Sequence, residues 1–205
     1  MLNVVKLEGK NKDDLLKKYF DENNCSESDI FLKEEEVQGK LFQGKKVVLT
    51  ILNKNDIKAF IKDYINNLSY FMNITINCEI READDIFSVL LVSSNNPIII
   101  GKDGRTLNSI QMLLRQAISA NTGFTVKVNM DASGYKAKKQ KNLEFEIKKI
   151  AKEVMSSKIE AKLDPMNSYE RRIIHNLIGN YEELETESFG EAPNRYVVIR
   201  CKEDK

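Results

Sequence analysis

A pair of glycines stands between an apolar run and an amphipathic helix, and this arrangement restricts the fold more than any other feature. The glycines are the first and last residues of the segment 101–104 (Gly-Lys-Asp-Gly), which follows three isoleucines at 98–100. Apolar residues then recur every three or four positions from Leu107 to Ile118, as on one face of a helix. Glycine lacks the Cβ that blocks close approach, and a helix N-terminus presents N–H groups and positive partial charge. The segment therefore predicts either a phosphodiester-binding loop or a plain structural turn.

The side chains of this loop fit a polyanion better than a mononucleotide. Lys102 and Arg105 supply cationic donors, whereas Asp103 places a carboxylate near the same path. The loop has neither the GxxxxGK[ST] pattern of a P-loop nor the GxGxxG pattern of a dinucleotide fold. The candidate binding residues of this loop are Gly101, Lys102, Asp103, Gly104 and Arg105.

The elements predicted around the loop follow a defined order. Apolar spacing predicts a helix over 57–71 capped by Asp56, strands at 73–80 and 86–92 joined by a turn, and a strand at 124–130. The order helix, strand, strand, glycine loop, helix, strand resembles the type II KH domain. That resemblance implies that the loop clamps about four unpaired nucleotides.

Residues 1–52 indicate a separate small unit of the order strand, helix, strand, strand. Leu41 and Phe42 lie in a glycine-bounded, lysine-rich loop between its last two strands. The pair predicts either an exposed surface for a protein partner or side chains that fold back onto their own core. Residues 53–56 predict a short linker.

The net charge of +1 argues against a globally basic nucleic-acid binder but conceals a basic stretch. Residues 131–158 carry eight lysines and four acidic side chains, whereas 159–205 carry seven basic and ten acidic ones. Most of the basic stretch belongs to a predicted helix over 135–157. Its lysines indicate either a solvated face or a phosphate-facing stripe. The candidates for such a stripe are Lys136, Lys138 and Lys139.

A second motif, Arg-xxx-His, lies near the C-terminus. Arg171 and His175 are four residues apart in a helix that Asn167 or Ser168 would cap, so both project from one face. Taken alone, this spacing fits an incidental surface pair as well as a functional one. The residues before it (165–170) and after it (185–191) resemble the Arg-xxx-His domain family, which binds single-stranded polynucleotides.

That resemblance assigns roles to several side chains. It implies that Arg171 contacts a phosphate or stacks on a base, and that His175 stacks or donates a hydrogen bond. Arg172 and Arg195 are the further candidates of this module. RNA and single-stranded DNA stay open as its ligand.

The three parts in order resemble the bacterial Jag family, also called the KhpB or SpoIIIJ-associated family. The resemblance covers essentially the whole chain and implies a non-enzymatic RNA-binding regulator linked to cell-envelope growth, division or sporulation. It also implies association with a small single-KH protein and with the membrane-insertase system. Two features depart from the family pattern. The linker is only a few residues long, and the glycine loop is Lys-Asp rather than doubly basic, so we expect modest affinity at that loop.

The expected fold is α+β, in three small modules. They are an N-terminal βαββ module (1–52), a short linker (53–56), a type II KH domain with a long lysine-rich connecting helix (57–158), and an Arg-xxx-His α/β module (159–205).

Other classes of function find less support. The cysteines at 25, 78 and 201 form no CxxC pair, and a single histidine supplies no zinc ligand set. Acidic clusters at 84–85 and 182–185 indicate turn and surface charge, so we expect no enzyme, cofactor or metal. No apolar run approaches a membrane span and no signal peptide is evident, so we expect a cytoplasmic protein that reaches the membrane only through a partner.

An alternative to RNA binding is a protein-interaction adaptor. In that case residues 1–52 would dock a membrane or division protein, and the KH surface would mainly pair with a partner or with a second copy of the chain. The two roles are compatible with each other.

Overall fold

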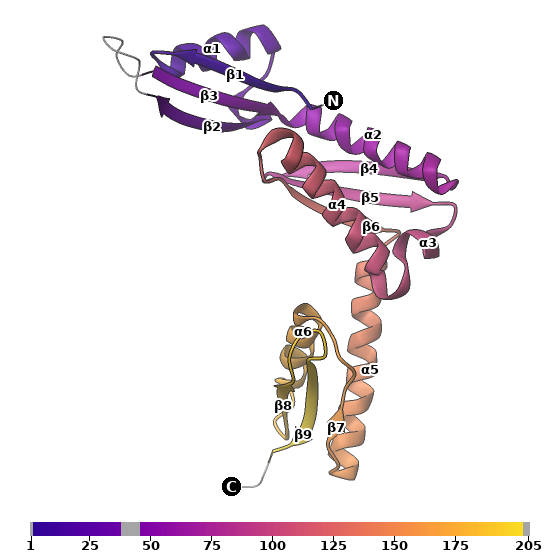
Figure 1. The fold of residues 1–205 in the computed structure, drawn as a ribbon. Helices are drawn as coiled ribbons and strands as arrows, with labels where there is room; N and C mark the ends of the chain where they lie inside the picture. Colours follow the sequence, from indigo (N-terminus) through magenta and orange to yellow (C-terminus); the bar gives the residue numbers. More distant parts are fainter. Residues whose placement is uncertain (1, 38–45, 203–205) are drawn as a thin grey trace. The chain divides into compact units, whose positions relative to one another are not determined.

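The structure is a computed structural model that describes residues 2–37 and 46–202. It divides into two compact units, Met1–Ser133 and Gly134–Lys205, here called the N-terminal and C-terminal units (Figure 1). The described residues form three three-stranded sheets, two in the first unit and one in the second. The expected α+β class and its three modules are therefore confirmed. Leu41 and Phe42 lie outside the described residues.

The first sheet is antiparallel, with β3 in the centre of the order β1-β3-β2. Helix α1 is capped by Asn11, whose side chain accepts from the Asp13 N–H at 3.0 Å. Leu16 of this helix and Leu49 and Ile51 of β3 belong to the buried cluster of the module. The elements are β1 (Val4–Gly9), α1 (Lys12–Asn23), η1 (Glu27–Asp29), β2 (Ile30–Val37) and β3 (Lys46–Asn53).

No spacer separates this module from the next in the described chain. Strand β3 ends at Asn53, and helix α2 (Lys54–Met72) begins at the following residue. Asn53 caps that helix, because its side chain accepts from the Asn55 N–H at 2.8 Å. Residues 53–56, expected as a linker, are therefore the end of a strand and the first turn of a helix.

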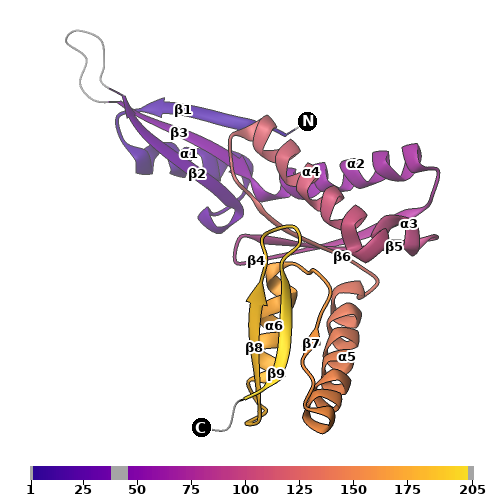
Figure 2. The same cartoon turned by 60° about the horizontal axis from the view of Figure 1, so that its bottom comes forward.

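The second sheet has the KH type II arrangement, with β4 antiparallel and β6 parallel to the central β5. Asp84 and Asp85, both with positive φ, make the two-residue turn between β4 and β5. Helices α2 and α4 cover one face of the sheet, where Phe87, Val89 and Leu91 are buried (Figure 2). The remaining elements are β4 (Ile76–Ala83), β5 (Ile86–Ser93), α3 (Asn96–Ile100), η2 (Lys102–Gly104), α4 (Arg105–Thr122) and β6 (Lys127–Ala132).

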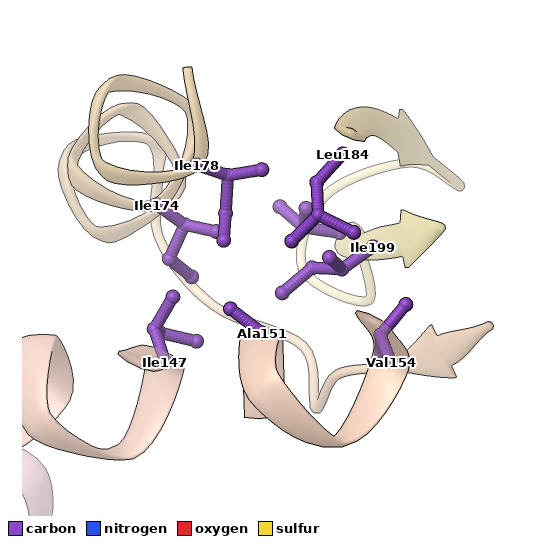
Figure 3. Close-up of a cluster of buried hydrophobic side chains, with 8 residues drawn as sticks. Ile147, Ala151, Val154, Ile174, Ile178, Leu184 and Ile199 are labelled. Carbon is purple, nitrogen blue, oxygen red and sulfur yellow. The ribbon is translucent and has the colours of Figure 1, made fainter. Parts of the chain in front are cut away.

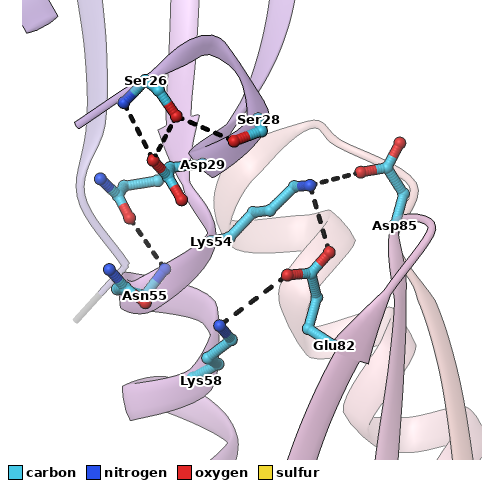
Figure 4. Close-up of polar contacts among 9 residues, drawn as sticks. Ser26, Ser28, Asp29, Lys54, Asn55, Lys58, Glu82 and Asp85 are labelled. Atoms are coloured by element: carbon cyan, nitrogen blue, oxygen red, sulfur yellow. Dashed lines mark hydrogen bonds and ion pairs between the residues drawn. The ribbon is translucent and has the colours of Figure 1, made fainter.

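A buried lysine links the two modules of the N-terminal unit. Lys54 is only 7% exposed, and its Nζ lies 2.6 Å from Asp85 Oδ1 and 3.2 Å from Glu82 Oε1 (Figure 4). Burial opposes the charged form, but the hydrogen bonds to Asp85 and Glu82 outweigh it, so the pKa of Lys54 is raised. The ammonium also lies 5.4 Å from the ring centre of Phe31 in β2. The first helical residue after the join is thus held by the β4–β5 turn.

An aromatic group continues this contact. The Phe31 ring lies 6.4 Å from the Phe87 ring and 6.3 Å from the Phe124 ring, centre to centre. Lys33 of β2 donates to the Gly123 carbonyl and lies 4.6 Å from the Phe124 ring centre. Strand β2 of the first module therefore packs against the segment that leads from α4 into β6.

The C-terminal unit packs two helices on an antiparallel sheet of order β7-β9-β8. Helix α5, expected to connect from the KH domain, lies within this unit and contributes Ile147, Ala151 and Val154 to its core (Figure 3). The core also takes in Ile174 and Ile178 from α6. The elements are α5 (Tyr135–Ser157), β7 (Ala161–Lys162), α6 (Ser168–Ile178), β8 (Leu184–Phe189) and β9 (Tyr196–Cys201).

Within residues 2–37 and 46–202, no helix combines the length and the apolar character needed to cross a bilayer.

Replacing Lys54 should destabilise the N-terminal unit. Lys54→Ala leaves the Glu82 carboxylate, 18% exposed, without its closest cation, so we expect the free energy of unfolding to fall by about 2 kcal/mol. Urea denaturation followed by circular dichroism measures this loss. Lys58→Ala is the matched control, because Lys58 reaches the same carboxylate only at 3.9 Å and is 37% exposed. An equal loss in both variants would contradict the role given to Lys54.

Candidate nucleic-acid interface

The glycine loop connects two helices rather than a strand and a helix. The apolar triplet at 98–100 belongs to the five-residue helix α3, and residues 102–104 form a single 3-10 turn before α4. Gly101, Asp103 and Gly104 all have positive φ, at 69°, 56° and 81°. Lys102 and Arg105 are exposed at the start of α4. The loop thus presents two cations beside the positive end of an 18-residue helix.

Both its close contacts and its backbone conformation require glycine at position 101. A Cβ at this position would lie 2.1 Å from Thr106 Oγ1 and 2.8 Å from Thr106 Cβ. Its φ of +69° is also a conformation that side-chain-bearing residues rarely adopt. The turn therefore brings its backbone close to the first turn of α4 in a way that requires glycine.

Two side chains of α4 reach the edge of the KH sheet. Gln111 Oε1 accepts from the Met130 N–H at 2.8 Å, and Arg115 donates to the Val128 carbonyl through Nε at 2.8 Å and through Nη2. Strand β6 pairs only with β5 among the described strands, so these are backbone groups of an edge strand. Gln111 and Arg115 thus satisfy polar groups along the open side of the sheet, next to the helix that the glycine loop begins.

The Arg-xxx-His pair meets the hairpin strand β8. His175 Nδ1 lies 2.6 Å from Thr186 Oγ1, and its Nε2 lies 2.9 Å from Ser188 Oγ. Arg171 Nη1 donates to the same Ser188 hydroxyl at 3.5 Å. Helix α6 begins with a capping box between Asn167 and Glu170, which fixes where its first turn starts.

One donor of this cluster lacks a partner. Among the described residues, Arg171 Nε is buried and makes no hydrogen bond. A buried guanidinium N–H without an acceptor is costly, because its hydration is lost and not replaced. An anionic ligand would supply the missing acceptor only if the side chains around Arg171 moved to expose this Nε.

The imidazole of His175 is kept neutral near pH 7. Burial lowers the pKa of His175 below its ordinary value of 6.5, and the neighbouring guanidinium groups of Arg171 and Arg195 lower it further. Arg171, His175 and Arg195 therefore lie close enough to interact, although Arg195 is exposed. Arg172 is also exposed and is not among the groups that shift the His175 pKa. A neutral ring serves for stacking and hydrogen bonding rather than as a charge.

The lysines at the start of α5 differ in their surroundings. Lys139 pairs with Glu170 of the α6 capping box at 2.7 Å. The Tyr169 hydroxyl donates to Gln140 Oε1 at 3.1 Å, which ties the same two helix ends together. Lys136 is exposed but takes part in an interaction within the chain, whereas Lys138 lies on the outer side of the helix.

Comparisons with known proteins agree with this geometry. Residues 58–130 match the KhpA/KhpB KH domain family, and residues 141–200 match the R-three-H domain family, which is the Arg-xxx-His domain. The RNA-binding protein KhpB of Clostridium symbiosum is 31% identical over 162 residues, which cover 78% of this chain and 73% of that protein. The chain belongs to the KhpB family. KhpB of Bacillus subtilis is 28% identical over 164 residues, 79% of each chain.

The Arg-xxx-His domain match takes in much of helix α5, because the matched segment begins at residue 141. KhpB of Lactiplantibacillus plantarum is 26% identical over 150 residues, which cover 73% of this chain but 46% of that longer protein. In the part of the chain that the structure describes, no group of three or more His, Cys, Asp or Glu side chains is placed to hold a metal ion.

Four residues at these sites were not predicted from the sequence. They are Gln111, Arg115, Thr186 and Ser188. The alternation of Leu184, Thr186 and Ser188 along β8 puts all three on one face of the strand. This alternation can be read from the sequence, but the sequence does not show which helix packs on this face of β8.

Gly101→Ala should lower the stability of the N-terminal unit by about 2–3 kcal/mol, because it adds a clash with Thr106 to an unfavourable φ. Gly123→Ala is a control at nearly the same φ of +72°, where the nearest atom is the end of the Lys33 side chain at 4.0 Å. For Gly123→Ala we expect the free energy of unfolding to fall by about 1 kcal/mol, from the backbone conformation alone. Equal losses in urea denaturation would show that the Thr106 contact does not matter.

Acid should destabilise the C-terminal unit through His175. Since the folded pKa lies below 6.5, the unfolded chain binds a proton that the folded unit excludes, so stability is lost as the pH falls below about 6.5. His175→Gln should lose less stability between pH 7.5 and 5.5 than the wild type does. Hydrogen exchange of C-terminal peptides measures the difference, and His175 is the only histidine in the chain. Parallel losses in both proteins would refute the assignment.

Proposed function

We propose that this KhpB-family chain binds single-stranded RNA through two linked sites and performs no catalysis. The first site is the glycine loop with Lys102 and Arg105, and the second is the cluster of Arg171, His175 and Arg195. The observation that supports it best is the exposed pair Lys102 and Arg105 beside the N-terminus of the 18-residue helix α4. The relatives with matching sequence are named RNA-binding proteins.

The two sites contribute differently to binding. The glycine loop offers two cations beside the positive end of α4, so it holds the phosphodiester chain with little discrimination between bases. The neutral His175 ring and the Arg171 guanidinium plane suit contacts with bases. Joining two weak sites in one chain raises the effective concentration of the second, so overall affinity exceeds that of either site.

In the cell, the proposed role is that of a cytoplasmic post-transcriptional regulator linked to envelope growth, division or sporulation. The KH match to a family that contains both KhpA and KhpB supports a small single-KH protein as its partner. Docking of a membrane or division protein by residues 1–52 is a further proposed role. Its candidate residues, Leu41 and Phe42, lie outside the described part of the chain.

Binding should depend on both sites. Lys102→Asp gives the loop two adjacent carboxylates, and Arg171→Ala with His175→Ala removes the second cluster. We expect each change to weaken binding of the full chain to single-stranded RNA about tenfold, equal to about 1.4 kcal/mol, with a larger loss on combination. Filter binding at fixed salt measures this.

Lys17→Asp, at an exposed position of α1, is the control for a change of charge. Circular dichroism shows whether each variant is folded. Unchanged affinity in folded variants of both sites would mean that RNA binding does not use them.

A further inference from the structure

Helix α5 buries one side only. Ile147, Ala151 and Val154 are 2%, 0% and 2% exposed in the core of the C-terminal unit. At about 100° per residue, a strip of exposed positions within about 100° of arc is turned away from this core. This strip, here called the outer face, consists of Lys138, Lys141, Phe145, Lys148, Lys149 and Lys152, and the exposed Glu146 and Glu153 border it beside Lys149.

Phe145 is the apolar centre of the outer face. Its side chain is 73% exposed, opposite the positions that fill the core. Lys141 and Lys149 lie four residues before and after it, and Lys148 lies three residues after it, so ammonium groups flank the ring on both sides. An aromatic ring between cations is the combination that holds a base and its neighbouring phosphates.

The lysines of the outer face are compensated only weakly by this chain. Lys149 and Glu153 approach to 3.9 Å, but both are highly exposed, at 73% and 63%, so water and salt screen the pair. Glu144 lies between the outer face and the buried side of the helix, whereas the exposed Glu146 borders the outer face together with Glu153. Five ammonium groups along about 21 Å of helix repel one another, and a polyanion would relieve that repulsion.

We propose that the outer face of α5 is a third contact for single-stranded nucleic acid, with Phe145 as a base-stacking residue and the surrounding lysines as phosphate contacts. The inference deepens the proposed function and rests on it. Its charge selects a polyanion, and its exposed ring selects unpaired bases, because a paired base has no free face in a duplex.

A lipid surface fits the outer face less well. Helices that lie in a membrane interface bury a broad apolar side with cations along its border. In α5 the broad apolar side is already occupied by the protein core, and one ring among five lysines remains outside. Lys136 and Lys139 belong to other sides of the helix, and Lys139 is held by Glu170.

The test compares full-length variants in fluorescence anisotropy with a labelled single-stranded RNA of about 20 nucleotides. Phe145→Ala should weaken binding about fivefold or more through loss of one stacked base. Lys141→Gln with Lys148→Gln should make the slope of log affinity against log salt shallower by about 1.4, since each phosphate contact contributes about 0.7.

Matched controls lie in the N-terminal unit. Phe71→Ala removes a ring that is 81% exposed at the end of α2, and Lys17→Gln with Lys18→Gln removes two exposed lysines of α1. Neither change should alter affinity or salt slope. Because Phe145 and its lysines are exposed, their variants should keep the thermal stability of the wild type.

The outcomes separate this inference from the function on which it rests. If the wild type binds no RNA, the proposed function and the outer face are both wrong. If the wild type binds and Lys102→Asp weakens it, but the Phe145 and lysine variants behave as the wild type does, the outer face alone is wrong. A sedimentation assay with vesicles rich in phosphatidylserine tests the lipid alternative. If the wild type sediments with the vesicles, and the Phe145 and lysine variants lose this sedimentation but keep their RNA affinity, the outer face contacts lipid and the proposal is wrong.

Discussion

The N-terminal unit depends on an ammonium group buried where a strand becomes a helix. Lys54 follows the last residue of β3 directly, and its charge is balanced by Glu82 and Asp85 at the β4–β5 turn. A buried lysine is tolerated only with such partners, so the turn and the helix start must keep their positions. Aromatic packing of Phe31 with Phe87 and Phe124 adds contact beside the same join. The first module is thus built onto the KH domain rather than tethered to it.

Much of the fold follows from apolar spacing. The helices over 105–122 and 135–157 and the βαββ order of the first module were predictable because their buried positions recur with regular periods. The type of the KH domain followed from element order around the glycine loop. The linker at 53–56 was a wrong expectation with a physical cause. Four polar residues indicate a loop, and nothing local reveals that Asn53 caps a helix while Lys54 finds two carboxylates about 30 residues later.

The candidate sites were predictable as residue types but not as contacts. The positions of Arg171 and His175 on one helix face follow from their spacing, whereas their shared partner Ser188 depends on how β8 packs against α6. In the same way, Gln111 and Arg115 occupy positions that the sequence assigns to a helix, but their hydrogen-bond partners belong to β6. Long-range pairing of this kind has no periodic signature. For the lysines of α5, the composition shows that the helix is basic. Only the structure, which shows the buried side of the helix, reveals which lysines face outward.

The direct passage from β3 into α2 also makes the length of the chain at this join matter. One residue inserted between Asn53 and Lys54 would turn every side chain of α2 by about 100° about the helix axis. Ile57, Ile61 and Ile65, all fully buried, would then leave the core together. Substitutions near the join alter one contact at a time, whereas a change of length alters them all. In this structure the number of residues at the join therefore sets how the buried side of α2 faces relative to β3.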